Sequence, residues 1–180
     1  TFLPENALQT VLLQFASSLR AERMTESVLD ATERIFDLIR AIKDYSYMDQ
    51  APLQEVDVAQ SLDNTLTMLN SQMADITIER DYEENPPHIM AYGSELNQVW
   101  TALIENAIEA MDGKGRLRLV TRHKGDTIMV EIWDDGPGVP PELTDRIFEP
   151  FFTTKAPGRG LGLGLDAAMR ITRKHRGHLK

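Results

Sequence analysis

The sequence predicts an α+β fold in which helices cover one face of a mixed sheet, with a helical segment before it. Helix and strand patterns are mixed along the chain without a repeating strand-helix-strand rhythm, which favours α+β over a doubly wound fold. Two strand patterns joined by a short turn predict a hairpin. An apolar share of 42% and a charged share of 26% over 180 residues are typical of a globular chain that forms its own core.

Residues 1–52 carry two helical patterns. Pro4 opens the first, and the second, over Thr25–Met48, spaces its apolar residues three and four apart, as in the seam of a coiled coil that packs against another helix. Because Pro52 disfavours helix in the residue before it, we place a domain boundary between residues 52 and 53. The apolar positions are Leu8, Val11, Leu12, Phe15 and Leu19 in the first pattern, and Val28, Ala31, Ile35, Leu38, Ile42 and Tyr45 in the second.

Residues 53–180 mix strand and helix patterns. Apolar residues alternate in the predicted strands and recur every three or four positions in the predicted helices. The strand candidates are Glu55–Val58, Asp75–Asp81, the short apolar stretch His88–Ala91, and two strands with Leu117, Leu119 and Thr121 and with Ile128, Val130 and Ile132, joined through Lys124-Gly125-Asp126. The helix candidates are one with Leu62, Leu66 and Leu69 in register, Gly93–Met111 and Leu161–Arg176.

Composition and charge exclude several classes of protein. The absence of cysteine excludes disulfides and thiol chemistry, and no apolar run approaches the roughly 18 residues of a membrane span, so we expect a cytoplasmic protein. Residues 53–112 hold 1 basic and 12 acidic residues, whereas residues 113–180 hold 13 basic and 8 acidic residues. The acidic middle argues against a nucleic-acid partner, and the basic last third suits a compact anion such as a triphosphate.

Six of the eleven glycines lie in residues 133–165. Asp134-Asp135-Gly136-Pro137-Gly138 follows a predicted strand, where a carboxylate can accept a hydrogen bond from an amino group such as that of adenine; a simple turn is the alternative. Gly158-Arg159-Gly160-Leu161-Gly162-Leu163-Gly164-Leu165 precedes the last predicted helix, so its backbone N–H groups and the helix dipole predict an anion cradle. This loop matches neither the P-loop nor the Rossmann fingerprint.

Two further stretches belong to the same pattern. The phenylalanine-rich stretch 147–152 leads to Lys155, and this segment predicts either a lid in which Lys155 and Arg159 meet phosphate charge or a buried connector between the loops. In the long helix, Asn106 lies beside the apolar stripe of Leu96, Val99, Leu103, Ala107 and Ala110. Its amide oxygen can complete the coordination of Mg²⁺, or it can bond a neighbouring backbone group.

Read together, these stretches resemble the boxes of sensor histidine kinases. Asn106 in LIENAIEA, DDGPG at 134–138, FEPFFTTK at 148–155 and GRGLGLGL at 158–165 are similar, in order and spacing, to the N, G1, F and G2 boxes. The resemblance covers residues 53–180 and implies the two-layer α/β sandwich of the histidine-kinase, gyrase and Hsp90 ATPases (GHKL). The second N-terminal helix, running into AIKDYSYMDQAP, resembles the second helix of the dimerisation and phosphotransfer hairpin, which implies a homodimer through the N-terminal helices.

The resemblance implies a role for each matching residue. Asp134 would bind the adenine amino group of ATP, Gly136 and Gly138 would shape that pocket, and Asn106 would ligate Mg²⁺. No residue receives a covalent catalytic role, because the donor's work is positioning and charge neutralisation. The residues expected around the phosphates are Lys155 of the ATP lid, Arg159, Gly160, Gly162, Leu163 and Gly164.

Three departures from the family pattern qualify these roles. Ala102 stands four residues before Asn106, where hydrolysing ATPases have a glutamate, so hydrolysis should be poor. Glu109 stands where a basic residue is often found, which leaves more of the phosphate charge to Lys155 and Arg159. None of the histidines, His88, His123, His175 and His178, is followed by an acidic residue.

The leading hypothesis is therefore the ATP-binding catalytic portion of a protein-histidine kinase in a two-component system. We expect its phosphoacceptor histidine upstream of Thr1 or in a partner protomer, and a response regulator as the next acceptor. We also expect the ATP-binding domain to be truncated after residue 180, because the family fold adds one or two more strands. The alternatives are a nucleotide-gated regulatory binding module without kinase activity and a hydrolysing ATPase.

Overall fold

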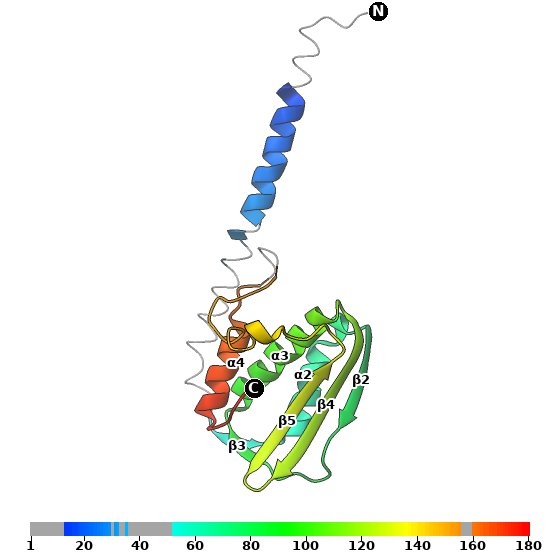
Figure 1. Ribbon diagram of the computed structural model, residues 1–180, viewed down its shortest axis with the longest axis vertical. Coiled ribbons are helices and arrows are strands. Elements are labelled where there is room, and N and C mark those ends of the chain that lie inside the picture. Colours follow the sequence, from blue (N-terminus) through cyan, green and yellow to red (C-terminus); the bar gives the residue numbers. More distant parts are fainter. Residues whose placement is uncertain (1–12, 30, 33–34, 36–51, 156–159) are drawn as a thin grey trace, which may run out of the picture. The chain divides into compact units, whose positions relative to one another are not determined.

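The computed structural model describes residues 13–29, 31–32, 35, 52–155 and 160–180. The chain divides into two compact units, one with the N-terminal helix and one with the α+β domain (Figure 1). Within the described ranges, no helix combines the length and the apolar character that crossing a bilayer requires.

The central sheet of the α+β domain has three strands. They are β2 (Asp75–Asp81), β4 (Lys114–Lys124) and β5 (Thr127–Asp134), in the order β2-β4-β5. β4 runs parallel to β2 and antiparallel to β5, so the sheet is mixed, and β4 and β5 form the predicted hairpin. The tight turn at Gly125 joins these two strands with φ +63°, a conformation that glycine adopts without strain.

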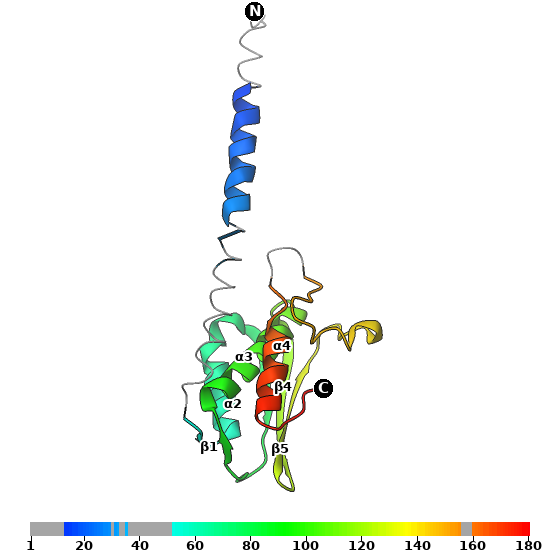
Figure 2. The ribbon, with the colours of Figure 1, turned by 90° about the vertical axis from the view of Figure 1, so that its left-hand side faces the viewer.

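Three helices and a second, two-stranded sheet complete the domain. The helices are α2 (Val58–Met68), α3 (Gly93–Ala110) and α4 (Gly164–Lys174), and β1 (Gln54–Val56) pairs antiparallel with β3 (Ile89–Ala91). Figures 1 and 2 show α2 and α3 against one face of the central sheet, with α4 beside α3. The predicted α+β class, with helices on one face of a mixed sheet, is confirmed. Two short 3₁₀ turns are η1 (Asn70–Gln72) and η2 (Pro141–Leu143).

The first predicted strand ends earlier than the sequence pattern indicates. It was predicted to run to Val58, but Val58 is the first residue of α2. The reason is the side chain of Asp57, whose Oδ1 accepts a hydrogen bond from the Gln60 N–H at 3.0 Å and so caps the helix.

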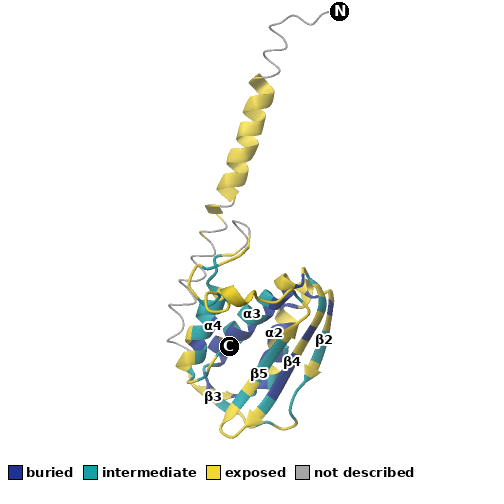
Figure 3. Ribbon diagram, viewed as in Figure 1, coloured by how far each residue is buried: buried dark blue, intermediate teal, exposed yellow. Residues whose placement is uncertain are grey.

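The core lies between the central sheet and the helices (Figure 3). Along β4, Leu117 and Leu119 face the helices and are 0% exposed, whereas Arg118 between them is exposed. This is the alternation expected of a strand with one buried face. The other large side chains that are almost fully buried include Leu62 of α2, Val99 and Ile104 of α3 and Ile171 of α4.

A buried polar link fixes α2 against α3. The Ser61 hydroxyl of α2 donates to Asn97 Oδ1 at 2.7 Å, and it accepts a hydrogen bond from the Trp100 indole N–H at 3.0 Å. Ser61 and Trp100 are 6% and 8% exposed, so water cannot easily replace either bond. The link therefore sets how the two helices are rotated and shifted relative to each other.

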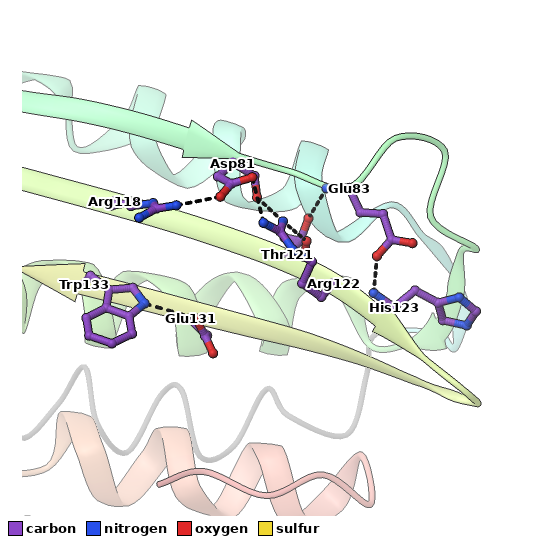
Figure 4. Close-up of polar contacts among 8 residues, drawn as sticks. All are labelled: Asp81, Glu83, Arg118, Thr121, Arg122, His123, Glu131 and Trp133. Carbon is purple, nitrogen blue, oxygen red and sulfur yellow. Dashed lines mark hydrogen bonds and ion pairs between the residues drawn. The ribbon is translucent and has the colours of Figure 1, made fainter.

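The face of the sheet away from the helices carries paired charges (Figure 4). Asp81 at the end of β2 pairs with Arg118 at 2.7 Å and with Arg122 at 2.8 Å, and the hydrogen bonds from Arg118 and Arg122 lower the pKa of the Asp81 carboxyl. On β5, the Trp133 indole N–H donates to Glu131 at 3.1 Å while the Trp133 side chain stays exposed. Apart from Val120 of β4, which is 7% exposed, the described side chains on this face are half-buried or exposed, as sheets with antiparallel pairs often show on their outer face.

The N-terminal helix is continuous over residues 13–29. The predicted start of a second helix at Thr25 is therefore wrong. Residues 20–26 contain neither glycine nor proline, and the Thr25 hydroxyl donates to the Ala21 carbonyl one turn earlier at 2.9 Å instead of capping a new helix. The described residues of the N-terminal helix are all exposed. The predicted positions Leu8, Val11, Leu12, Leu38, Ile42 and Tyr45 lie outside the described residues.

Replacing Ser61 by alanine should destabilise the α+β domain. The change leaves the buried Trp100 indole N–H without an acceptor, which should lower the free energy of unfolding by about 1–3 kcal/mol. Urea unfolding followed by circular dichroism measures this loss. Ser94→Ala, at an exposed serine of α3, is the matched control and should change stability by less than about 0.5 kcal/mol. Equal effects of the two changes would contradict a structural role for the Ser61 link.

Candidate functional site

One end of the candidate site lies where β5 meets the first glycine loop. Asp134 is the last residue of β5, and its Oδ1 accepts a hydrogen bond from the Gly136 N–H at 2.9 Å. A Cβ on Gly136 would lie 2.6 Å from that oxygen and 3.0 Å from the Cβ of Ala110, the last residue of α3. Only glycine therefore lets the loop lie against α3 while it orients the Asp134 carboxylate. Gly138 follows in the same loop and is exposed.

One face of α3 connects this loop with the second glycine loop. Ala102, Asn106 and Ala110 are four residues apart and so share a face of the helix. At a rise of about 1.5 Å per residue, Ala102 and Ala110 are separated by about 12 Å along the helix axis. A Cβ on Gly164, the first residue of α4, would lie 3.6 Å from the Ala102 Cβ. The two loops therefore meet the same helix face about two turns apart.

Lys155 lies over this face between the two loops. Its Nζ forms an ion pair with the Glu109 carboxylate and lies 3.5 Å from Asn106 Oδ1. A Cβ on Gly160 would lie 3.6 Å from Lys155 Cδ, so the second glycine loop borders the lysine. Burial lowers the pKa of the Lys155 amine, and the negative charge of Glu105 acts in the opposite direction.

The aromatic segment and the second glycine loop contact each other through their backbones. The Phe151 N–H donates to the Gly162 carbonyl at 3.0 Å. Gly162 has φ +65°, and a Cβ there would lie 2.6 Å from the carbonyl carbon of Phe152. The guanidinium of Arg146 lies 4.4 Å from the centre of the Phe152 ring, a cation–π contact on the same segment. Phe151 itself is 66% exposed, so the segment is not a buried connector at that residue.

The predicted site residues form two groups along α3. Leu163 directly precedes α4. The sequence predicted that this helix starts at Leu161, but it starts at Gly164, because φ +65° at Gly162 is incompatible with a helix. Arg159 lies outside the described residues. The group near Asn106 includes Lys155 and Gly160, with Gly162, Leu163 and Gly164 in the same loop, and the other group is Asp134, Gly136 and Gly138.

Sequence reasoning missed one residue of the site. The sequence drew attention to Glu109 only because related proteins often have a basic residue at that position, whereas the structure shows that it is the ion-pair partner of Lys155. The available signal was its position three residues after Asn106, which places it on a neighbouring part of the helix surface.

The group around Asn106 fits a magnesium ion that takes few ligands from the protein. Asn106 supplies an amide oxygen, and Mg²⁺ prefers oxygen ligands and usually keeps several waters beside substrate phosphates. Among the residues that the structure describes, no three His, Asp or Glu side chains gather into a metal site. Phosphate oxygens would therefore have to complete the coordination together with water.

The sequence matches a known family over its second half. Residues 92–180 match the histidine kinase-, DNA gyrase B- and HSP90-like ATPases. The chain is 30% identical over 180 aligned residues to the sensory histidine kinase/phosphatase NtrB of Rhodobacter capsulatus. This alignment covers 92% of this chain and 50% of NtrB. It is also 30% identical over 175 residues to the signal transduction histidine-protein kinase AtoS of Escherichia coli, in an alignment that covers 94% of this chain and 28% of AtoS. The chain thus spans about half the length of NtrB and less of AtoS.

The fold is also similar to solved structures. The catalytic domain of the histidine kinase ThkA superposes with a TM-score of 0.63 at 26% sequence identity, over 68% of this chain and 81% of that domain. The similarity in sequence and the similarity in fold therefore point to the same group of proteins.

Replacing Gly162 by alanine should separate the aromatic segment from the second glycine loop. Alanine at Gly162 would meet the Phe152 backbone, so the Phe151 amide should lose its hydrogen bond and exchange with solvent at least about tenfold faster. Hydrogen exchange followed by NMR measures this rate. Gly125→Ala is the matched control, because Gly125 has nearly the same φ, +63°, but no atom within 4 Å of the new Cβ. Unchanged exchange at Phe151 in Gly162→Ala would contradict the proposed contact.

Proposed function

Because this chain contains an ATPase domain of the histidine kinase-, DNA gyrase B- and HSP90-like family and is related to sensor histidine kinases, we propose that it is the ATP-binding catalytic portion of a two-component kinase. In this proposal it binds Mg·ATP and donates the γ-phosphate to a histidine of a partner segment. The observation that carries the proposal is that the two glycine loops meet one face of α3, with the Asp134 carboxylate at one end of this face and the Asn106 amide on the face itself.

The Asp134 end suits an adenine base. An ionised carboxylate can only accept hydrogen bonds, and the Gly136 N–H already orients one of its oxygens. The exocyclic amino group of adenine is a donor, whereas guanine has a carbonyl oxygen at the corresponding ring position and would be repelled. The proposal therefore assigns Asp134 to the choice of adenine over guanine.

The Asn106 end suits the phosphates. The backbone N–H groups of Gly160–Gly164 and the positive end of the α4 dipole favour anions, and Lys155 and Arg159 add positive charge. Magnesium, when bound, would neutralise phosphate charge and orient the γ-phosphate, with Asn106 as its protein ligand. These residues bind and orient the nucleotide, and none of them attacks it.

Transfer to a protein is favoured over hydrolysis by the residue one turn before Asn106. Ala102 carries no carboxylate that could activate water, and its Cβ lies against the start of α4. The Mg·ATP bound there would keep its γ-phosphate until an acceptor side chain approaches.

The acceptor histidine in this proposal belongs to a partner segment or protomer. His175 has a structural role, since its Nε2 accepts a hydrogen bond from the Tyr92 N–H at 3.1 Å and its Nδ1 lies 2.8 Å from the Ile171 carbonyl oxygen. His123 lies on β4, and His88 and His178 lie outside helices. We assign residues 1–52 to the dimerisation and phosphotransfer region and residues 53–180 to the ATP-binding domain. A response regulator would be the next acceptor, and the reaction would take place in the cytoplasm.

Replacing Asp134 by alanine should weaken binding of ADP and ATP. Loss of a hydrogen bond to a charged group costs about 1.5–3 kcal/mol, which corresponds to roughly 10- to 150-fold in affinity. Isothermal titration calorimetry measures the change. Asp135→Ala removes an equal charge from the next residue and should leave affinity within about threefold. If both variants bind ADP as the wild type does, the assigned base site is wrong.

Transfer of phosphate tests the reaction itself. We expect the chain, incubated with Mg²⁺, labelled ATP and a separate hairpin that carries a phosphoacceptor histidine, to label that hairpin. Asn106→Ala should reduce labelling by at least about tenfold, since even changes around a metal ligand cost about 10- to 100-fold. Tight ATP binding without labelling would instead identify a nucleotide-gated binding module. Steady release of phosphate without an acceptor would identify a hydrolysing ATPase.

A further inference from the structure

The surface of α3 around Asn106 is acidic, and Lys155 is a cation placed against it. Glu105 precedes Asn106, and Glu109 follows one turn later. The Lys155 ammonium pairs with the Glu109 carboxylate and lies 3.5 Å from Asn106 Oδ1. Gly160 borders the aliphatic part of the same lysine, so the side chain is confined between the loop and the helix. A protein cation therefore occupies the surroundings of Asn106.

The Lys155 ammonium and a magnesium ion cannot share Asn106. Mg²⁺ binds oxygen at about 2.0–2.1 Å, and an ammonium near the same oxygen would place two cations a few ångströms apart. If Asn106 held magnesium, Lys155 would have to leave the amide oxygen of Asn106, and the phosphates of the nucleotide would offer its charge a new partner. The attraction between Glu109 and Lys155 then opposes binding, because it stabilises only the ligand-free arrangement.

We propose that Glu109 is a positioning residue that holds Lys155 beside Asn106 in the ligand-free chain and releases it to the phosphates when the magnesium nucleotide binds. The inference rests on the proposed function, and it adds a residue and an exchange of partners to it. The side chains of Lys155 and Glu109 are 35% and 51% exposed. An ion pair this exposed is weak, so it can slow neither binding nor release by much, and it changes affinity by at most about fivefold.

A double-mutant cycle on the full chain tests the proposal. The four proteins are the wild type, Glu109→Gln, Lys155→Gln and the double variant, and the measurement is the affinity for Mg·ADP by calorimetry. Glu109→Gln has two effects, because it releases Lys155 and also removes a negative charge near the phosphates. Only the second effect persists in the Lys155→Gln background. We therefore expect Glu109→Gln to raise affinity by about two- to fivefold more when Lys155 is present than when it is replaced.

The outcomes separate this inference from the proposed function. An equal gain from Glu109→Gln in both backgrounds, or a smaller gain when Lys155 is present, would overturn the inference and leave the nucleotide site standing. Failure of the wild type to bind Mg·ADP would overturn both. Because both side chains are partly exposed, each variant should fold, and circular dichroism of all four proteins checks this.

Discussion

The rotation of α3 about its own axis is the constraint on which the site depends. Val99 and Ile104 of this helix are buried in the core, and the Ser61–Trp100 bond fixes the helix against α2. With the buried stripe fixed, the helical period leaves the face with Ala102, Asn106 and Ala110 turned toward the two glycine loops. A small residue at each end of this face lets a backbone approach it closely, as Gly136 does at Ala110 and Gly164 does at Ala102.

The second helix of the site, α4, is held in place from its far end. The Lys174 ammonium pairs at 2.7 Å with Glu95, whose side chain is 3% exposed, and His175 accepts the Tyr92 N–H. These contacts tie the end of α4 to the start of α3, so α4 runs antiparallel to α3 and its first residue arrives at Ala102. A buried ion pair contributes little net stability, but loss of one partner would leave a buried charge, which favours this one arrangement. The same contacts that complete the core thus aim the start of α4 at the proposed phosphate site.

The position of a charged side chain in the fold decides which group it neutralises. The basic composition of the last third of the sequence favours a triphosphate, but its arginines Arg118 and Arg122 pair with Asp81 on the outer face of the sheet (Figure 4). What borders the proposed phosphate site is the acidic surface of α3, balanced by Lys155. Binding of a triphosphate there would require cations from the lysine and from magnesium, which explains why one asparagine and one lysine carry so much of the proposed chemistry.

The sequence by itself determined the α+β class, the mixed sheet, the hairpin and the order of the four boxes, because apolar periodicity and glycine spacing are local properties of a chain. It did not determine where α2 begins, that residues 13–29 form one helix, or that Glu109 faces Lys155. Those depend on the Asp57 cap, on a hydroxyl that bonds within the helix, and on a contact between residues 46 positions apart. The tertiary structure alone decided which charges neutralise each other, because a side chain takes its partner from whatever the packing of the core brings within reach.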